Sequence, residues 1–169
     1  MNTHPTFFRP GHFVLRPYFT DPSLLSCIEG CVLLSQVEEL NSRARGWIVA
    51  MKQSHGDAKM DWEALHGALG RSCQILPILC NDTSSDRYPT GLLSVRFKAP
   101  QTLSTLQEFA RAHDVSLERQ TPFILEQAQF SLSHPTISFL PDVVKQVERD
   151  ERVEAVWMDA DSAFVRLWR

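Results

Sequence analysis

The chain has 169 residues, of which 43% are hydrophobic, including ten Phe and four Trp. This excludes a disordered protein, because so much apolar side chain is enough to form a core. The formal net charge of −3 gives no electrostatic reason to expect nucleic acid or an anionic membrane as the main partner. The length allows one ordinary domain or two small ones.

The N-terminus lacks the basic start and the apolar run of a secretory signal, and no segment approaches the roughly 18 apolar residues of a membrane span. The sequence therefore predicts a cytoplasmic protein. Four cysteines are too few for a secreted disulfide scaffold, and we expect all of them to be reduced: Cys27, Cys31, Cys73 and Cys80.

The N-terminal half predicts alternating strands and helices. Asp21 and Pro22 are typical of a helix start, and the helix that they open is expected to run to Arg45 and stop at Gly46. Asp61 is the expected cap of a second helix, whose Trp62 and Leu65 share one face. Strands are expected at residues 11–19, 47–52 and 73–80. The order is β-α-β-α-β.

The C-terminal half has clearer periodicity. Alternation of apolar and polar residues predicts a strand that begins at Gly91 and ends at Pro100, and Thr102 is the expected cap of the helix that follows. Further elements are expected in the order strand, strand, helix, strand, at residues 115–119, 123–132, 139–150 and 153–158. The order β-α-β-β-α-β is that of a ferredoxin-like sandwich, with two helices on one face of a four-stranded antiparallel sheet.

The polar run at residues 81–90 contains clustered turn formers and a proline, and it indicates a domain boundary. We expect an α/β domain of unknown role at residues 1–86 and a ferredoxin-like domain at residues 87–169. The predicted fold class is therefore α+β, with a C-terminal ferredoxin-like sandwich preceded by a smaller α/β region. Whether the first half repeats the fold of the second stays open at this point.

Residues 91–161 resemble the propeptide, or inhibitor I9, domain of subtilisin-like serine proteases. The resemblance rests on three segments: GLLSVRFKAP (91–100), ARAHDV (110–115) and LPDVVKQVERDERVEAVWMDAD (140–161). The last is the most specific, because the second helix of the family runs into an acidic D-x-x-V break, a strand and an acidic end. The matching residues here are Asp150, Val153, Val156 and Asp159.

In that family the domain inhibits its own protease and helps it to fold. The open sheet face packs on two surface helices of the enzyme, and the C-terminal extension lies in the active-site cleft. The resemblance implies a non-enzymatic protein-binding module that inhibits or chaperones a separate subtilisin-like serine protease, because no protease follows the domain here. It implies these partner-binding residues: Val153, Ala155, Trp157, Asp159, Asp161, Phe164, Arg166, Leu167, Trp168 and Arg169.

Two details of that interface are implied. Arg169 would lie nearest the catalytic serine of the protease, and Asp159 or Asp161 would meet the N-terminus of a helix of the partner. The segment from Phe164 to Arg169 has an alternative interpretation as one more strand of the sheet, which its alternating side chains also fit.

Reactive side chains do not form a recognisable catalytic or metal motif. Cys27 and Cys31 stand four residues apart in a predicted helix, which would suit a metal, but burial as small apolar residues is the simpler interpretation. Cys80 with His66 or His55 as a base has no local signature. We therefore predict no enzymatic activity, no cofactor and no metal.

Two other functions stay open. The chain could be an adaptor or assembly subunit of a multiprotein complex, which would use the same fold without any protease. A small-molecule-sensing dimer is the third hypothesis, and it would require a ligand-dependent rise in melting temperature. The sequence leaves the identity of the partner and the oligomeric state unassigned.

Overall fold

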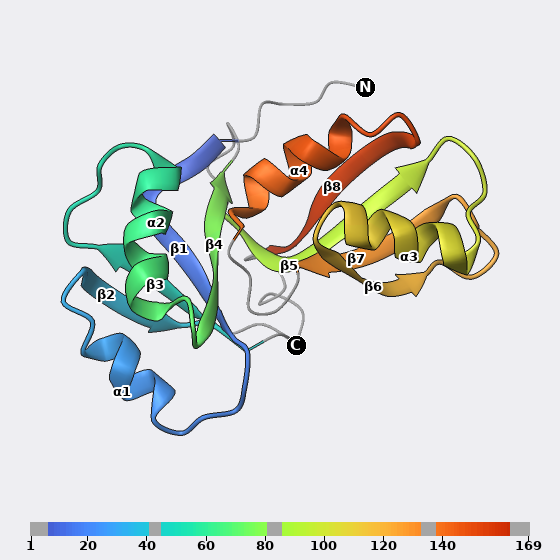
Figure 1. Cartoon of the computed structure of the whole chain (residues 1–169). Helices are drawn as coiled ribbons and strands as arrows, with labels where there is room; N and C mark the ends of the chain where they lie inside the picture. Colours follow the sequence, from blue (N-terminus) through green and yellow to red (C-terminus); the bar gives the residue numbers. More distant parts are fainter. Residues whose placement is uncertain (1–6, 41–44, 81–85, 133–137, 163–169) are drawn as a thin grey trace. The chain divides into compact units, whose positions relative to one another are not determined.

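The computed structural model describes residues 7–40, 45–80, 86–132 and 138–162 (Figure 1). In this part of the chain, single helices are separated by pairs of consecutive strands. The elements are β1 (Phe7–Pro17), α1 (Leu24–Glu29), β2 (Leu34–Glu39), β3 (Trp47–Met51), α2 (Ala58–Leu69), β4 (Cys73–Cys80), β5 (Arg87–Phe97), α3 (Leu103–Ala112), β6 (Val115–Gln120), β7 (Gln127–Leu132), α4 (Leu140–Glu148) and β8 (Val153–Ser162).

The predicted fold class is wrong. The described chain is mainly an antiparallel sheet of eight strands, ordered β2-β3-β1-β4-β5-β7-β6 with β8 paired to β5, and its four helices are short. The N-terminal half is not a smaller α/β region, because it contains as many strands as the C-terminal half. The sequence predicted a helix through residues 34–39. In the structure these residues form the strand β2.

Two compact units divide the chain. Unit 1 comprises residues 1–90 and 160–169, and unit 2 comprises residues 91–159. In unit 1 the strand order is β2-β3-β1-β4, and the strands of the second half follow the order β6-β7-β5-β8. Each half therefore has the same connectivity, strand-helix-strand-strand-helix-strand, with its first strand between its third and its fourth. The first half repeats the topology of the second, a point that the sequence had left open.

Helix α1 is much shorter than the sequence predicts. It ends at Glu29, where Gly30 closes it by donating to the Ser26 carbonyl. The apolar stretch beyond it pairs with β3 instead of continuing the helix, with Val37 opposite Val49 and Glu39 opposite Trp47. A short apolar run fits both periods, and here the pairing with β3 decides between them.

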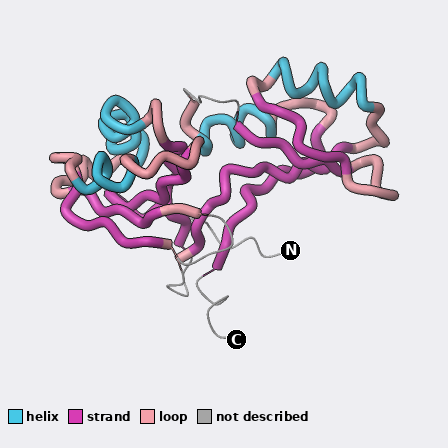
Figure 2. Tube along the Cα trace, turned by 90° about the horizontal axis from the view of Figure 1, so that it is seen from below, coloured by secondary structure: helices cyan, strands magenta, loops and turns pink. Residues whose placement is uncertain are grey.

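The core of unit 1 lies between the sheet and α2, and the two helices of the unit lie on one face of its strands (Figure 2). Asp57, not Asp61, is the N-cap of α2, and its side chain accepts from Lys59 N and Met60 N. Trp62 and Leu65 are buried, and the indole Nε1 of Trp62 donates to Ile75 O at 3.1 Å. This bond fixes the helix against β4.

Unit 2 has an aromatic core. Phe97, Phe109 and Phe130 are buried, and the Phe97 and Phe109 rings meet edge to face at 5.0 Å. Thr102 caps α3, as predicted, and forms a reciprocal capping box with Thr105. The capping box fixes the start of α3, and the contacts of Phe109 with Phe97 and Phe130 hold the helix against β5 and β7.

Candidate functional site

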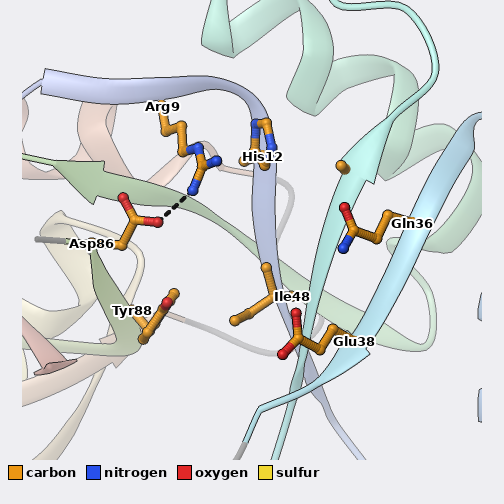
Figure 3. Close-up of a pocket in the computed structure, with 8 residues that line it drawn as sticks. Arg9, His12, Gln36, Glu38, Ile48, Asp86 and Tyr88 are labelled. Atoms are coloured by element: carbon orange, nitrogen blue, oxygen red, sulfur yellow. Dashed lines mark hydrogen bonds and ion pairs between the residues drawn. The ribbon is translucent and has the colours of Figure 1, made fainter. Parts of the chain in front are cut away.

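A hollow of about 150 Å³ lies on the sheet of unit 1 (Figure 3). The strand register explains its floor. Gln36 pairs with Ala50 and Ala50 with His12, so that these three residues form one row across β2, β3 and β1. Because Ala50 is small, the row has a gap between the two larger side chains. Two residues further along β2, Glu38 pairs with Ile48, and both residues line the same hollow.

The remaining wall carries an ion pair. Arg9 Nη1 donates to Asp86 Oδ2 at 2.5 Å, so that the two charges compensate each other, and Tyr88 lies beside them (Figure 3). His12 Nδ1 lies 2.7 Å from Pro10 O. A carbonyl can only accept, so Nδ1 carries the proton, and Nε2 of the neutral ring is an acceptor. Glu38 forms no ion pair within the described residues, which makes it the uncompensated charge of the hollow.

A bulge in β1 separates Arg9 from His12 along the chain. The register of β1 against β4 shifts between Phe8 and Phe13, and Gly11 within the shift has a φ of 65°. A Cβ at this position would lie 2.9 Å from Ser54 Cβ. The bulge that shapes this end of the hollow therefore requires glycine.

A second candidate site is the turn between β6 and β7 in unit 2. It exposes three consecutive apolar side chains: Phe123 is fully exposed, Ile124 is 46% exposed and Leu125 is 50% exposed. Leu103, in the first turn of α3, is 60% exposed. The backbone N–H of Gln101, two residues before Leu103, donates to Leu125 O at 2.9 Å, so that α3 begins beside this turn. We call Leu103, Phe123, Ile124 and Leu125 the apolar tip.

Hydrogen bonds fix the backbone of the tip. Thr121 N donates to Gln127 O at 2.9 Å, and Ile124 N donates to Thr121 O at 3.2 Å. The Gln120 side chain donates to Leu125 O at 3.1 Å. Phe123 has a φ of 65°, a left-handed conformation that costs an L-residue about 1–2 kcal/mol. The turn thus holds a fully exposed Phe in a strained conformation, and such strain is typical of functional sites.

Sequence reasoning missed the apolar tip, because it began a strand at Phe123, whereas β7 begins at Gln127. One signal was present in the sequence. Pro122 directly precedes the three apolar residues, and a proline disfavours a central strand and favours a turn.

The structure describes only part of the predicted partner-binding set. On β8, Val153 is buried, and Ala155 and Trp157 are exposed. Asp159 accepts from Ser94 Oγ at 3.0 Å and also from the Gln129 side chain. Asp161 accepts from Arg16 Nη2 at 3.3 Å. The two carboxylates therefore have partners within the chain. The remaining predicted residues lie outside the described part: Phe164, Arg166, Leu167, Trp168 and Arg169.

The acidic segment between α4 and β8 makes several contacts in unit 2. Asp150 Oδ1 accepts from Arg152 Nε at 2.9 Å, and Oδ2 lies 2.8 Å from His113 Nε2. The hydrogen bonds of Arg152, with that of His113, hold the pKa of Asp150 well below its usual range, although burial opposes them. The backbone of Val153 donates to Asp150 O at 3.0 Å. Asp150 thus links the end of α3 to the turn between α4 and β8.

No protein-family model matches this chain, and neither a curated protein nor a solved structure is significantly similar to it. No helix in the described ranges is long and apolar enough to cross a membrane. Within the same ranges, no three His, Cys, Asp or Glu side chains lie close enough together to hold a metal ion.

The cysteine pair considered for a metal is not arranged as predicted. Because α1 ends at Glu29, Cys31 lies beyond the helix that contains Cys27, and the two thiols do not share a helix face. Burial raises the pKa of the Cys73 thiol to about 12, which leaves it a poor nucleophile. All four cysteines are free thiols.

The histidines considered as bases have other contacts. His66 stacks on Trp62, with ring centroids 4.6 Å apart. His55 Nδ1 lies 2.7 Å from Asp61 Oδ1, and Ser54 Oγ donates to the other oxygen of that fully buried carboxylate at 2.6 Å. Burial raises the pKa of Asp61, but the backbone N–H of His55, which donates to Oδ1 at 2.8 Å, and the two side-chain bonds outweigh it and hold the pKa below its ordinary value. The serine hydroxyl is thus bound to the carboxylate, where it helps to close the loop before α2.

Proposed function

We propose that this chain is a non-enzymatic protein-binding module that docks its apolar tip into a pocket of a folded partner protein. The fully exposed Phe123, held in a left-handed conformation by a hydrogen-bonded turn, carries the proposal. A preformed aromatic anchor loses little conformational freedom on binding, and such anchors dominate the affinity of many interfaces. A protein is a better occupant than an anionic membrane, because the chain has a net charge of −3 and membrane-binding surfaces are rich in Lys and Arg.

The resemblance of residues 91–161 supports a subtilisin-like serine protease as the first partner to test, with inhibition or assisted folding as the outcome of binding. Exposed Ala155 and Trp157 on β8 leave that strand accessible for the contact that the resemblance implies. An adaptor role in a multiprotein complex is the alternative. The proposal places the protein in the cytoplasm, because four free thiols suit a reducing compartment.

The test compares binding partners of three versions of the full chain by quantitative mass spectrometry. Phe123→Asn removes the aromatic ring and suits the left-handed backbone. Val32→Asn is the matched control, because Val32 is 78% exposed and lies in unit 1. A partner that binds the wild type and Val32→Asn but not Phe123→Asn is the expected result.

The purified partner then decides between the two roles. Inhibition of a subtilisin-like protease by the wild type, at least about tenfold weaker for Phe123→Asn, supports the protease role, since loss of an aromatic hot spot costs at least about 1.4 kcal/mol. A partner without protease activity supports the adaptor role. If all three versions retain the same partners with equal affinity, the apolar tip is not the docking surface and the proposal fails.

A further inference from the structure

We infer that the hollow in unit 1 binds a guanidinium group carried on a short alkyl chain. This inference does not depend on the proposed function, because the hollow and the apolar tip belong to different units and are tested by different variants. It rests on the size of the hollow, on its uncompensated negative charge and on its apolar and aromatic walls.

The size of the hollow limits the ligand. A cavity of about 150 Å³ accommodates a molecule the size of benzene. An ethylguanidinium ion has as many non-hydrogen atoms as benzene, and so do the outer atoms of an arginine side chain. The hollow exists because Ala50 stands between Gln36 and His12 in one cross-strand row, so that a larger residue at this position would fill it.

The charge of the hollow favours a cation. Arg9 and Asp86 neutralise each other at 2.5 Å, which leaves the Glu38 carboxylate as the net charge. The other free polar groups can also accept: His12 Nε2, because Nδ1 faces Pro10 O, and the amide oxygen of Gln36. A ligand rich in N–H donors and without acceptors matches this set.

The arrangement of the acceptors selects a guanidinium over an ammonium. Glu38 and Gln36 lie two residues apart on β2, which separates their backbones by about 6.6 Å. Both side chains extend toward the centre of the hollow (Figure 3). A planar guanidinium presents five N–H groups in a fixed fork and can bridge two such acceptors, whereas an ammonium is a compact point charge.

The walls of the hollow suit the flat faces of that ion. Ile48 forms an apolar surface of the hollow next to Glu38, and the Tyr88 ring lies on the side of the hollow opposite Glu38 (Figure 3). Guanidinium groups are weakly hydrated and stack on aromatic faces, and the interaction strengthens as the site loses water. The alkyl chain would then leave the hollow toward solvent.

The test is a titration of the full chain, labelled with ¹⁵N, with ethylguanidinium chloride, followed by amide chemical shifts. We expect saturable shifts centred on residues 36–38 and 48–50, with a dissociation constant in the millimolar range for so small a ligand. Butylammonium chloride is the comparison cation and should bind at least about fivefold more weakly. Equal affinity for the two ions, or no saturable shift with ethylguanidinium, would overturn the inference.

Two variants test the site itself. Glu38→Gln should weaken binding about five- to tenfold, because it replaces a charge-assisted hydrogen bond with a neutral one. Glu39→Gln is the matched control, because its side chain extends to the other side of the strand, and it should leave the affinity unchanged. Ala50→Leu should abolish the shifts by filling the hollow. Equal binding by Glu38→Gln and Glu39→Gln would contradict the inference.

A last pair of ligands identifies the source of the guanidinium. N-acetyl-L-arginine N-methylamide represents an arginine within a polypeptide, and free L-arginine adds a charged amino group and a carboxylate. Tighter binding of the blocked form supports an arginine side chain of a protein as the occupant. Tighter binding of the free form supports an amino acid at the same guanidinium site. Failure of both to bind would refute the site.

Discussion

Arg16 Nη2 on β1 lies 3.3 Å from Asp161 Oδ2, and the two residues are 145 positions apart in the sequence. The same guanidinium donates to Pro89 O, from Nε at 3.2 Å and from Nη2 at 3.1 Å. Arg16 is only 6% exposed, so that these oxygens replace its hydration. Burial lowers the pKa of Arg16, and Asp161 opposes this shift. One buried cation therefore binds three separate segments of unit 1 together.

Replacing Arg16 should destabilise the fold strongly. We expect Arg16→Met to lower the free energy of unfolding by about 2–4 kcal/mol, because the carbonyl of Pro89 and the carboxylate of Asp161 lose their donor. Urea unfolding followed by Trp fluorescence measures the loss. Arg71→Met is the control, since Arg71 is exposed after α2 and its replacement should change stability by less than about 0.5 kcal/mol. Equal losses for the two variants would refute the role of Arg16.

The partly buried cluster of Asp150, His113 and Arg152 predicts that stability depends on acidic pH. Arg152, and then His113, lower the pKa of Asp150 in the folded protein, so that folding favours its charged form. Its contribution is fully present above the unfolded pKa of about 3.9 and is lost as the pH falls toward the lower folded value. We therefore expect the stability of the wild type to fall steadily below about pH 4.

Asp150→Asn tests this assignment. It should lower the free energy of unfolding at pH 7 by about 1–3 kcal/mol, because the buried His113 and the partly exposed Arg152 lose their charged partner. It should also flatten the dependence on pH below about 4, as urea unfolding at several pH values would show. Glu151→Gln, an exposed neighbour, should retain the slope of the wild type. If Asp150→Asn retains the pH dependence of the wild type, that dependence comes from other carboxylates.

The sequence predicts elements well where local signals agree. In unit 2, the Thr102 cap has a local cause and is confirmed. The strand predicted at residues 91–100 overlaps β5, which begins earlier, at Arg87, and ends at Phe97. In unit 1, the residues between Gly30 and Leu40 carry no strong period, and pairing with β3 makes them a strand. Such pairing depends on a partner strand outside the segment, so the periodicity of the segment itself does not determine it.

The candidate sites show the same limit. The hollow depends on the register that aligns Gln36, Ala50 and His12 across three strands, which no local motif encodes. Residues 123–125 of the apolar tip were predicted as part of a strand, because Ile124 has the same parity as the apolar residues Ala128 and Phe130. Its strained turn depends on hydrogen bonds from Gln101 and Gln120, which come from neighbouring elements. Tertiary contacts therefore decide both sites.

Two glycines with positive φ should differ in their tolerance of a side chain. Gly56 has a φ of 76°, and no atom lies within 4 Å of the position that a Cβ would take, so that Gly56→Ala should cost only the backbone strain, about 1 kcal/mol. Gly11→Ala adds a contact with Ser54 Cβ at 2.9 Å and should cost at least about 1 kcal/mol more. Urea unfolding of the two variants measures the difference. Equal costs would indicate that the β1 bulge adapts to the added methyl group.

The left-handed backbone at Phe123 should make the wild type less stable than a variant with Asn at this position. Its side chain is fully exposed, so that Phe123→Asn removes no packing, and Asn adopts the left-handed conformation more readily. We expect this variant to raise the free energy of unfolding by about 0.5–1.5 kcal/mol, measured by urea unfolding.

Val32→Asn is the control for this prediction, because Val32 is 78% exposed and lacks a positive φ, and it should change stability by less than about 0.5 kcal/mol. A loss of stability in Phe123→Asn would mean that the ring packs against the fold and is not available to a partner. A gain in stability together with lost binding would instead separate the two roles of this residue. Strain at Phe123 would then be the cost of holding the apolar tip ready for its partner.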